Sequence, residues 1–115
     1  MSSITLYPEL VDYIYSYCNE FKTENELIAG KTFMHLLKNP TERMKTVMLK
    51  TGWISDKKEI KELMKDGYTA FKERIASRIF SEYIDELKLN LCPKCFKITR
   101  TPNAKQCRFC FYDWH

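Results

Sequence analysis

Polar and apolar positions alternate through the first 88 residues with the spacing of three and four that is typical of amphipathic helices. In the first such segment Leu10, Ile14 and Cys18 recur on one face, which predicts a buried stripe. The tyrosines of this segment spread around the helix, so Tyr13 and Tyr15 are expected outside its core face, either as exposed rings of a protein interface or as partly buried rings with solvated hydroxyls. The whole pattern predicts five helices, over residues 6–21, 23–38, 40–50, 55–67 and 69–88.

Capping residues mark the ends of these segments. The TENE sequence that starts at Thr23 is a capping-box pattern, and Asn39 or Thr41 is expected to begin the third helix. Gly52 suits the left-handed position that ends this third helix, and Ser55 is the expected N-cap of the fourth. Local signals therefore support the helical boundaries that the periodicity predicts.

The fifth segment, residues 69–88, is apolar on two sides and must therefore contact more than one neighbour. It is expected at the centre of a helical domain that covers residues 1–88. Residues 89–115 follow without a Gly/Ser linker, so they are expected to pack on this last helix. No internal repeat or low-complexity tract is evident along the chain.

Four cysteines form two Cys-x-x-Cys pairs near the end of the chain, Cys92 with Cys95 and Cys107 with Cys110. Eleven residues separate the pairs, a spacing that suits one tetrahedral zinc ion, and a closed four-thiolate shell makes the zinc structural. Disulfides are the alternative, but residues 1–15 lack the basic and apolar regions of a signal peptide. A reducing, cytoplasmic location is therefore expected. A rubredoxin-like iron site has the same spacing and stays open.

The CPKC sequence at residues 92–95 resembles a knuckle of the zinc-ribbon superfamily, which usually reads CPxCG, and CRFC at 107–110 is similar to the second knuckle. The resemblance covers about the last 25 residues. It implies two knuckles on a β-hairpin, with the four cysteines as ligands. The predicted fold is thus mainly α, with a bundle of about five helices followed by a small C-terminal zinc-ribbon β-hairpin.

The chain departs from this family pattern after the second cysteine of each pair, where the family usually has glycine. Here the position is occupied by Phe96 and Phe111. A positive φ is common at this position and costs a bulky residue about 1–2 kcal/mol. Zinc binding in small fingers is worth about 10–16 kcal/mol, so the site is expected to form despite this cost.

The net charge of +4 is concentrated in the C-terminal part. Residues 1–87 contain 13 basic and 14 acidic side chains, whereas residues 88–115 contain six basic side chains and one acidic one. Basic groups bind phosphates, and exposed aromatic rings stack on unpaired bases. The predicted nucleic-acid contacts are Lys94, Lys97, Arg100, Lys105 and Arg108.

The leading hypothesis is a small, non-enzymatic, zinc-stabilised binding protein that engages RNA or a ribonucleoprotein through its basic ribbon. An enzyme is disfavoured because the chain has no Gly-rich phosphate loop, no HExxH motif and no nucleophile–base pair, and no small-molecule substrate is expected. A DNA-reading helix-turn-helix over residues 55–80 is disfavoured because its second helix is apolar on two sides. No run of apolar residues is long enough for a membrane span.

The alternative is a protein–protein adaptor whose helices form the binding face and whose zinc ribbon is purely structural. Burial of Phe109, Tyr112 and Trp114 against the fifth helix, together with an exposed apolar patch on the first or second helix, would favour this adaptor.

Overall fold

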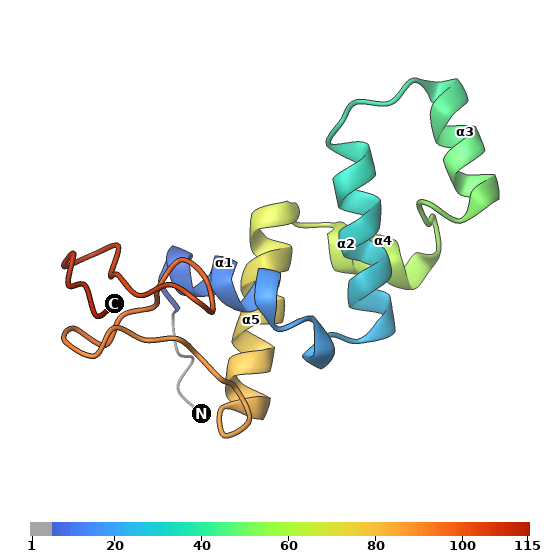
Figure 1. Cartoon of the computed structure of the whole chain (residues 1–115). Coiled ribbons are helices and arrows are strands. Elements are labelled where there is room, and N and C mark those ends of the chain that lie inside the picture. The colour runs from blue at the N-terminus through green and yellow to red at the C-terminus, as the bar shows by residue number, and fades with distance from the viewer. Residues whose placement is uncertain (1–5) are drawn as a thin grey trace. The chain divides into compact units, whose positions relative to one another are not determined.

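The computed structural model describes residues 6–115, which are mainly helical and have almost no extended structure (Figure 1). The prediction of a mainly α chain with about five helices is confirmed, although every helix is shorter than predicted. The chain divides into two compact units, residues 22–72 and the residues on either side of them, and the division falls within the last helix. The elements are α1 (Pro8–Tyr17), the short 3-10 helix η1 (Asn19–Phe21), α2 (Glu24–Leu36), α3 (Glu42–Thr51), α4 (Lys58–Met64) and α5 (Tyr68–Tyr83).

The predicted ends of α2 and α3 are largely confirmed. Thr23 caps α2 through a complete capping box, because its hydroxyl accepts from the Glu26 N–H at 3.2 Å and its own N–H donates to the Glu26 carboxylate at 2.8 Å. Thr41, the later of the two candidates, caps α3. Gly52 ends α3 at a φ of 80°, the left-handed conformation expected of it.

The predicted N-cap of α4 is wrong. Its N-cap is Lys57, and the hydroxyl of Ser55 instead accepts from the Lys57 N–H at 3.2 Å, two residues along the chain. The physical reason lies in a distant residue. The N–H of Ser55 donates to the Thr32 hydroxyl of α2 at 3.2 Å, which holds the chain extended for two residues more before α4 begins.

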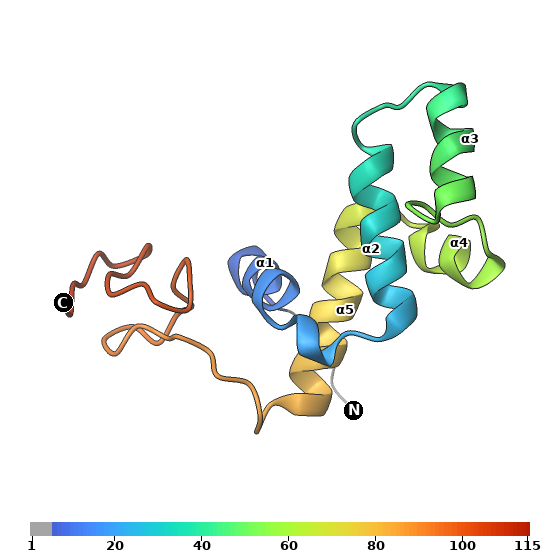
Figure 2. The same cartoon turned by 45° about the vertical axis from the view of Figure 1, so that its right-hand side comes forward.

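Within residues 22–72, α2 packs against α4, as both views of the ribbon allow the reader to follow (Figures 1 and 2). The ring of Phe33 lies 5.1 Å from that of Phe71 and 5.2 Å from that of Tyr68, at the start of α5. The buried residues of this unit include Ala29, Thr32, Ile54, Ile60 and Phe71. α3 has no buried residue, although it is amphipathic.

The other unit combines α1, η1, the rest of α5 and the C-terminal segment. Its buried residues include Leu10, Val11, Tyr13, Ile14, Cys18, Ile75, Ala76 and Ile79. The Arg78 guanidinium donates to the Phe21 carbonyl at 2.9 Å, and the rings of Phe21 and Tyr83 lie 4.7 Å apart. These contacts hold η1 against α5.

The expected position of Tyr13 outside the core is wrong, since only 4% of this residue is exposed, whereas Tyr15 is half-buried. Burial raises the pKa of the Tyr13 hydroxyl, although a hydrogen bond from the backbone of Asn90 opposes this effect. The residues that follow α5 therefore cover a side of α1 that the helical pattern alone places in solvent.

The C-terminal segment forms loops without a strand in the described residues (Figure 2). Two isolated antiparallel bridges join Leu91 to Ile98 and Gln106 to Asp113, and the β-hairpin implied by the family resemblance is not shown. The predicted domain boundary after residue 88 stays a prediction. Within residues 6–115, every helix is too short or too polar to span a bilayer.

Candidate metal centre

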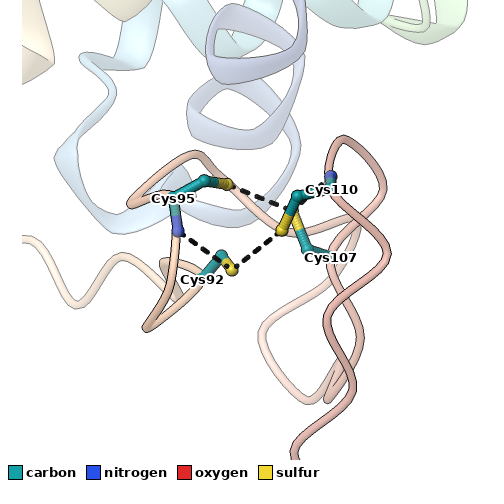
Figure 3. A group of neighbouring side chains, drawn as sticks. All are labelled: Cys92, Cys95, Cys107 and Cys110. Atoms are coloured by element: carbon teal, nitrogen blue, oxygen red, sulfur yellow. Dashed lines mark hydrogen bonds between the residues drawn. The ribbon is translucent and has the colours of Figure 1, made fainter.

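The sulfur atoms of the four predicted ligands converge on one point (Figure 3). The Sγ atoms of Cys92 and Cys110 are 3.6 Å apart, those of Cys95 and Cys107 are 3.4 Å apart, and all four lie within 4.8 Å of one another. A tetrahedral ion with zinc–sulfur bonds of about 2.3 Å spaces its sulfurs by about 3.8 Å. The four thiols therefore fit a tetrahedral metal ion with only small adjustments.

The first pair of ligands lies on a tight turn that aims backbone N–H groups at sulfur. The N–H groups of Lys94 and Cys95 lie 3.3 and 3.4 Å from the Cys92 sulfur. The Cys92 N–H donates to the Lys97 carbonyl at 2.9 Å, and the Phe96 N–H donates to the Cys92 carbonyl at 2.9 Å. Donors of this kind stabilise a thiolate.

The second pair repeats this turn. The N–H groups of Phe109 and Cys110 lie 3.3 and 3.4 Å from the Cys107 sulfur. The Cys107 N–H donates to the Tyr112 carbonyl at 2.8 Å, and the Phe111 N–H donates to the Cys107 carbonyl at 3.1 Å. Each hydrogen bond has its counterpart in the first turn, fifteen residues earlier.

The two turns form a short internal repeat, which corrects the view that the chain contains none. The segments LCPKCFKI and QCRFCFYD, which begin at Leu91 and Gln106, share the pattern C-x-x-C-F, and each is closed by one antiparallel bridge. Only three residues are identical between them, too few for a repeat to be recognised without the matching hydrogen bonds. We call the two turns the knuckles.

Phe96 and Phe111 occupy equivalent positions in the knuckles, and both have a φ of 64°. The positive φ expected after the second cysteine is thus present without glycine. This conformation costs a bulky residue about 1–2 kcal/mol. Each Phe residue is 71% exposed, so burial of its ring offsets little of that cost.

The thiols of Cys92, Cys95 and Cys107 have different pKa values because the clustered sulfurs and the nearby N–H groups act on each of them differently. Burial raises the pKa of Cys107, but the N–H groups of Cys110 and Phe109 and the neighbouring thiols outweigh it and lower the pKa to about 6. The pKa of Cys92 is lowered in the same way, again against burial. For Cys95, the Lys97 N–H lowers the pKa, but burial and the neighbouring thiols raise it to about 11. The site therefore ionises stepwise, and a cation would complete the ionisation.

The predicted nucleic-acid contacts lie on the surface around this centre. Arg108 is half-buried and the other four basic residues are exposed. Among residues 6–115 none of the five is paired with a carboxylate. Their positive charge is therefore available to an anionic partner.

Three of these five residues, Arg100, Lys105 and Arg108, line one hollow of about 440 Å³. Phe111 and His115 line it as well. His115 is not among the clustered ligands, and its ring contacts the Asp113 carboxylate, whose pKa it lowers by hydrogen bonding from backbone and ring.

The remaining two basic residues lie against aromatic rings. The Nζ atom of Lys97 is 4.8 Å from the centre of the Phe109 ring, and that of Lys94 is 5.8 Å from the centre of the Tyr112 ring. The Arg108 guanidinium also lies 5.8 Å from the centre of the Phe109 ring. The structure therefore gathers three of the five predicted contacts in one hollow and places three of the five, one of them shared, beside rings.

The aromatic residues whose burial would favour an adaptor over an RNA site differ in their burial. Phe109 is half-buried, and its ring makes a T-shaped contact with the ring of Tyr7, the residue before α1, with 6.0 Å between the ring centres. Tyr112 and Trp114 stack on each other at 6.1 Å, and Tyr112 is 40% exposed. Large apolar side chains are also exposed on α2, namely Leu27 and Met34.

A second hollow, of about 370 Å³, lies on α3 and was not singled out from the sequence. The apolar residues of α3 have the spacing of an ordinary bundle helix, so the sequence gives no sign that none of them is buried in the structure. The hollow is lined by Arg43, Met44, Val47, Met48, Thr51 and Trp53.

No family model, curated protein or solved structure matches this chain. The four clustered cysteines and the surfaces described above are therefore the observations on which a function rests.

Proposed function

We propose that this chain is a small zinc-stabilised binding protein whose residues 89–115 form a zinc ribbon that binds single-stranded RNA. The spacing of the four sulfurs supports zinc, and the paired knuckles support a ribbon-like site. Four thiolates close the coordination shell, so the metal is structural and the protein acts by binding rather than by catalysis. Free thiols of this kind suit a reducing compartment such as the cytoplasm.

The hollow of about 440 Å³, called the basic hollow from here on, is the observation that supports RNA binding. Arg100, Lys105 and Arg108 line one concave surface, and no carboxylate neutralises any of them in the described part of the chain. Unpaired basic groups around a hollow favour a phosphate backbone, because binding releases the counterions that surround it. A single strand is favoured over a duplex because its unpaired bases can stack on an exposed aromatic ring, and Phe111 lines the same hollow.

A salt titration of binding to a short unstructured RNA tests this proposal. The logarithm of affinity falls with the logarithm of salt concentration by about 0.7 for each phosphate neutralised on a single strand. Replacing Arg100, Lys105 and Arg108 together by Gln is therefore expected to lower this slope by about 2. Fluorescence anisotropy of a labelled oligonucleotide measures both affinity and slope.

The matched control removes the same charge elsewhere. Lys31, Lys57 and Lys58 are exposed in residues 22–72, and their replacement by Gln should leave the slope unchanged. Equal losses in both variants, or no binding by the natural protein at low salt, would contradict the proposal.

A separate experiment identifies the metal. Native mass spectrometry of the purified protein should show one zinc ion for each chain. A colourless protein supports zinc, because an iron centre with four thiolates absorbs visible light strongly.

A second function is favoured by α3, which has no buried residue and carries the apolar hollow lined by Met44, Val47 and Trp53. Residues 30–55 contain five basic side chains and one acidic one. An apolar hollow in a basic surface complements an acidic amphipathic helix of a partner protein, whose apolar side chains would enter it. This site would make the chain an adaptor.

Titration with a synthetic Glu/Leu amphipathic peptide tests the adaptor. In a Trp114→Phe background, insertion of the peptide should shift Trp53 emission to shorter wavelength, and Val47→Asp should abolish the shift. A Lys/Leu peptide of the same apolar pattern is the control. An equal response to both peptides, or a response to anionic vesicles alone, would contradict a protein partner of this kind.

A further inference from the structure

Phe96 and Phe111 have a feature that the metal centre does not require. Each is a bulky residue at a φ of 64°, where glycine would adopt the same backbone without strain. Each ring is 71% exposed and adds little to the core. An exposed phenylalanine is present at the equivalent position of each knuckle. The backbone strain of a positive φ therefore occurs at both positions, and packing of the rings offsets little of it.

The other aromatic rings of this segment are already engaged. Phe109 meets the edge of Tyr7 at 6.0 Å and has the Lys97 ammonium 4.8 Å from its centre. Tyr112 and Trp114 stack on each other. Among the described aromatic contacts none involves Phe96 or Phe111, so these two rings offer their faces to a ligand.

Phe111 places an exposed aromatic ring beside basic side chains. It lines the hollow of about 440 Å³ together with Arg100, Lys105 and Arg108. A nucleotide has a flat base and an anionic phosphate, and this hollow offers an aromatic face and basic groups to match them.

We propose that Phe96 and Phe111 are base-stacking residues for a single-stranded nucleic acid, with Phe111 acting over the basic hollow. This inference rests on the proposed RNA function and deepens it, because it assigns affinity to two particular rings. It also accounts for the absence of glycine after the second cysteine of each knuckle, since glycine has no face on which a base can stack.

The test compares Phe111→Gly and Phe96→Gly with the natural protein in binding to an oligouridylate and to an abasic strand of the same length. Each glycine variant is expected to weaken binding of the oligouridylate by about 5- to 150-fold, the range measured for single stacking residues. Binding of the abasic strand should not change, because phosphate contacts remain. Phe111→Trp should retain the affinity for oligouridylate, because indole also stacks.

Measurement of the metal content shows whether the glycine variants fold correctly. Glycine suits the positive φ, so each glycine variant is expected to retain one metal ion for each chain. If both glycine variants bind oligouridylate as the natural protein does while the Arg100/Lys105/Arg108 variant loses affinity, the stacking inference is overturned and RNA binding stands. Equal losses on the abasic strand would also overturn it.

Discussion

The backbone N–H of Ile98 donates a 2.9 Å hydrogen bond to the hydroxyl of Tyr7, ninety-one residues earlier in the chain. Ile98 is fully buried and closes the first knuckle through its bridge to Leu91. The ring of the same tyrosine meets Phe109 of the second knuckle at 6.0 Å. One side chain, placed at the N-cap of α1, therefore contacts both halves of the metal centre.

Tyr7→Phe should reveal how strongly α1 supports the knuckles. The substitution leaves the buried N–H of Ile98 without its acceptor, which costs about 1–3 kcal/mol in unfolding free energy. Tyr17→Phe is the control, because Tyr17 is exposed on α1 and should change stability by less than about 0.5 kcal/mol. Denaturant unfolding followed by circular dichroism measures both, and equal stabilities would show that the Tyr7 hydroxyl is dispensable.

Removal of the metal should affect the two units unequally. The C-terminal segment has no strand and few buried apolar residues, so the metal supplies much of its folding free energy, of the order of 10 kcal/mol in small zinc domains. A strong chelator is therefore expected to abolish amide protection in residues 89–115 while α2 and α4 retain theirs. Hydrogen exchange resolved by residue measures this, and protection unchanged in the C-terminal segment would be evidence against a structural metal.

Metal affinity should fall as the pH falls, because protons compete with the metal for the thiolates. Without metal, Cys107 has a pKa lowered to about 6 and is ionised at pH 7, whereas Cys95 has a pKa raised to about 11 and is protonated. Binding at pH 7 thus releases the Cys95 proton but not one from Cys107. Below pH 6 the Cys107 proton must be released as well, so a plot of log affinity against pH should steepen by about one.

Competition with a chromophoric chelator between pH 5 and pH 8 measures this slope. A Cys18→Ala variant serves as the control, because Cys18 is buried on α1 and lies outside the metal cluster. It should reproduce the natural curve. A slope that stays constant through pH 6 would show that Cys107 is not the thiol that titrates there.

The capping box of α2 should be a local contribution to stability. Thr23→Ala removes the hydroxyl that accepts from the Glu26 N–H and is expected to cost about 1 kcal/mol. Asn25→Ala is the comparison, since Asn25 is exposed in the first turn of the same helix and is not part of the capping box. Thermal unfolding should therefore shift to lower temperature for Thr23→Ala and change little for Asn25→Ala.

The parts of this molecule that were predicted correctly depend on neighbours in sequence. The capping box at Thr23 involves residues three apart, and the left-handed end of α3 needs only Gly52. The clustering of the four cysteines was predictable because each Cys-x-x-Cys pair places two sulfurs on one turn, and eleven residues suffice for the pairs to meet.

The sequence by itself therefore determined the helices, most of their caps and the cluster of four cysteines, since these follow from interactions over a few residues. Tertiary structure alone decided that Tyr13 is buried, that Tyr7 contacts both knuckles, and that α3 has no buried residue. It also decided which rings of the C-terminal segment are exposed, those of Phe96 and Phe111, and which are engaged. The physical reason is that burial depends on contacts between segments far apart in the sequence. The periodicity within one helix or knuckle does not indicate which distant segment will pack against it.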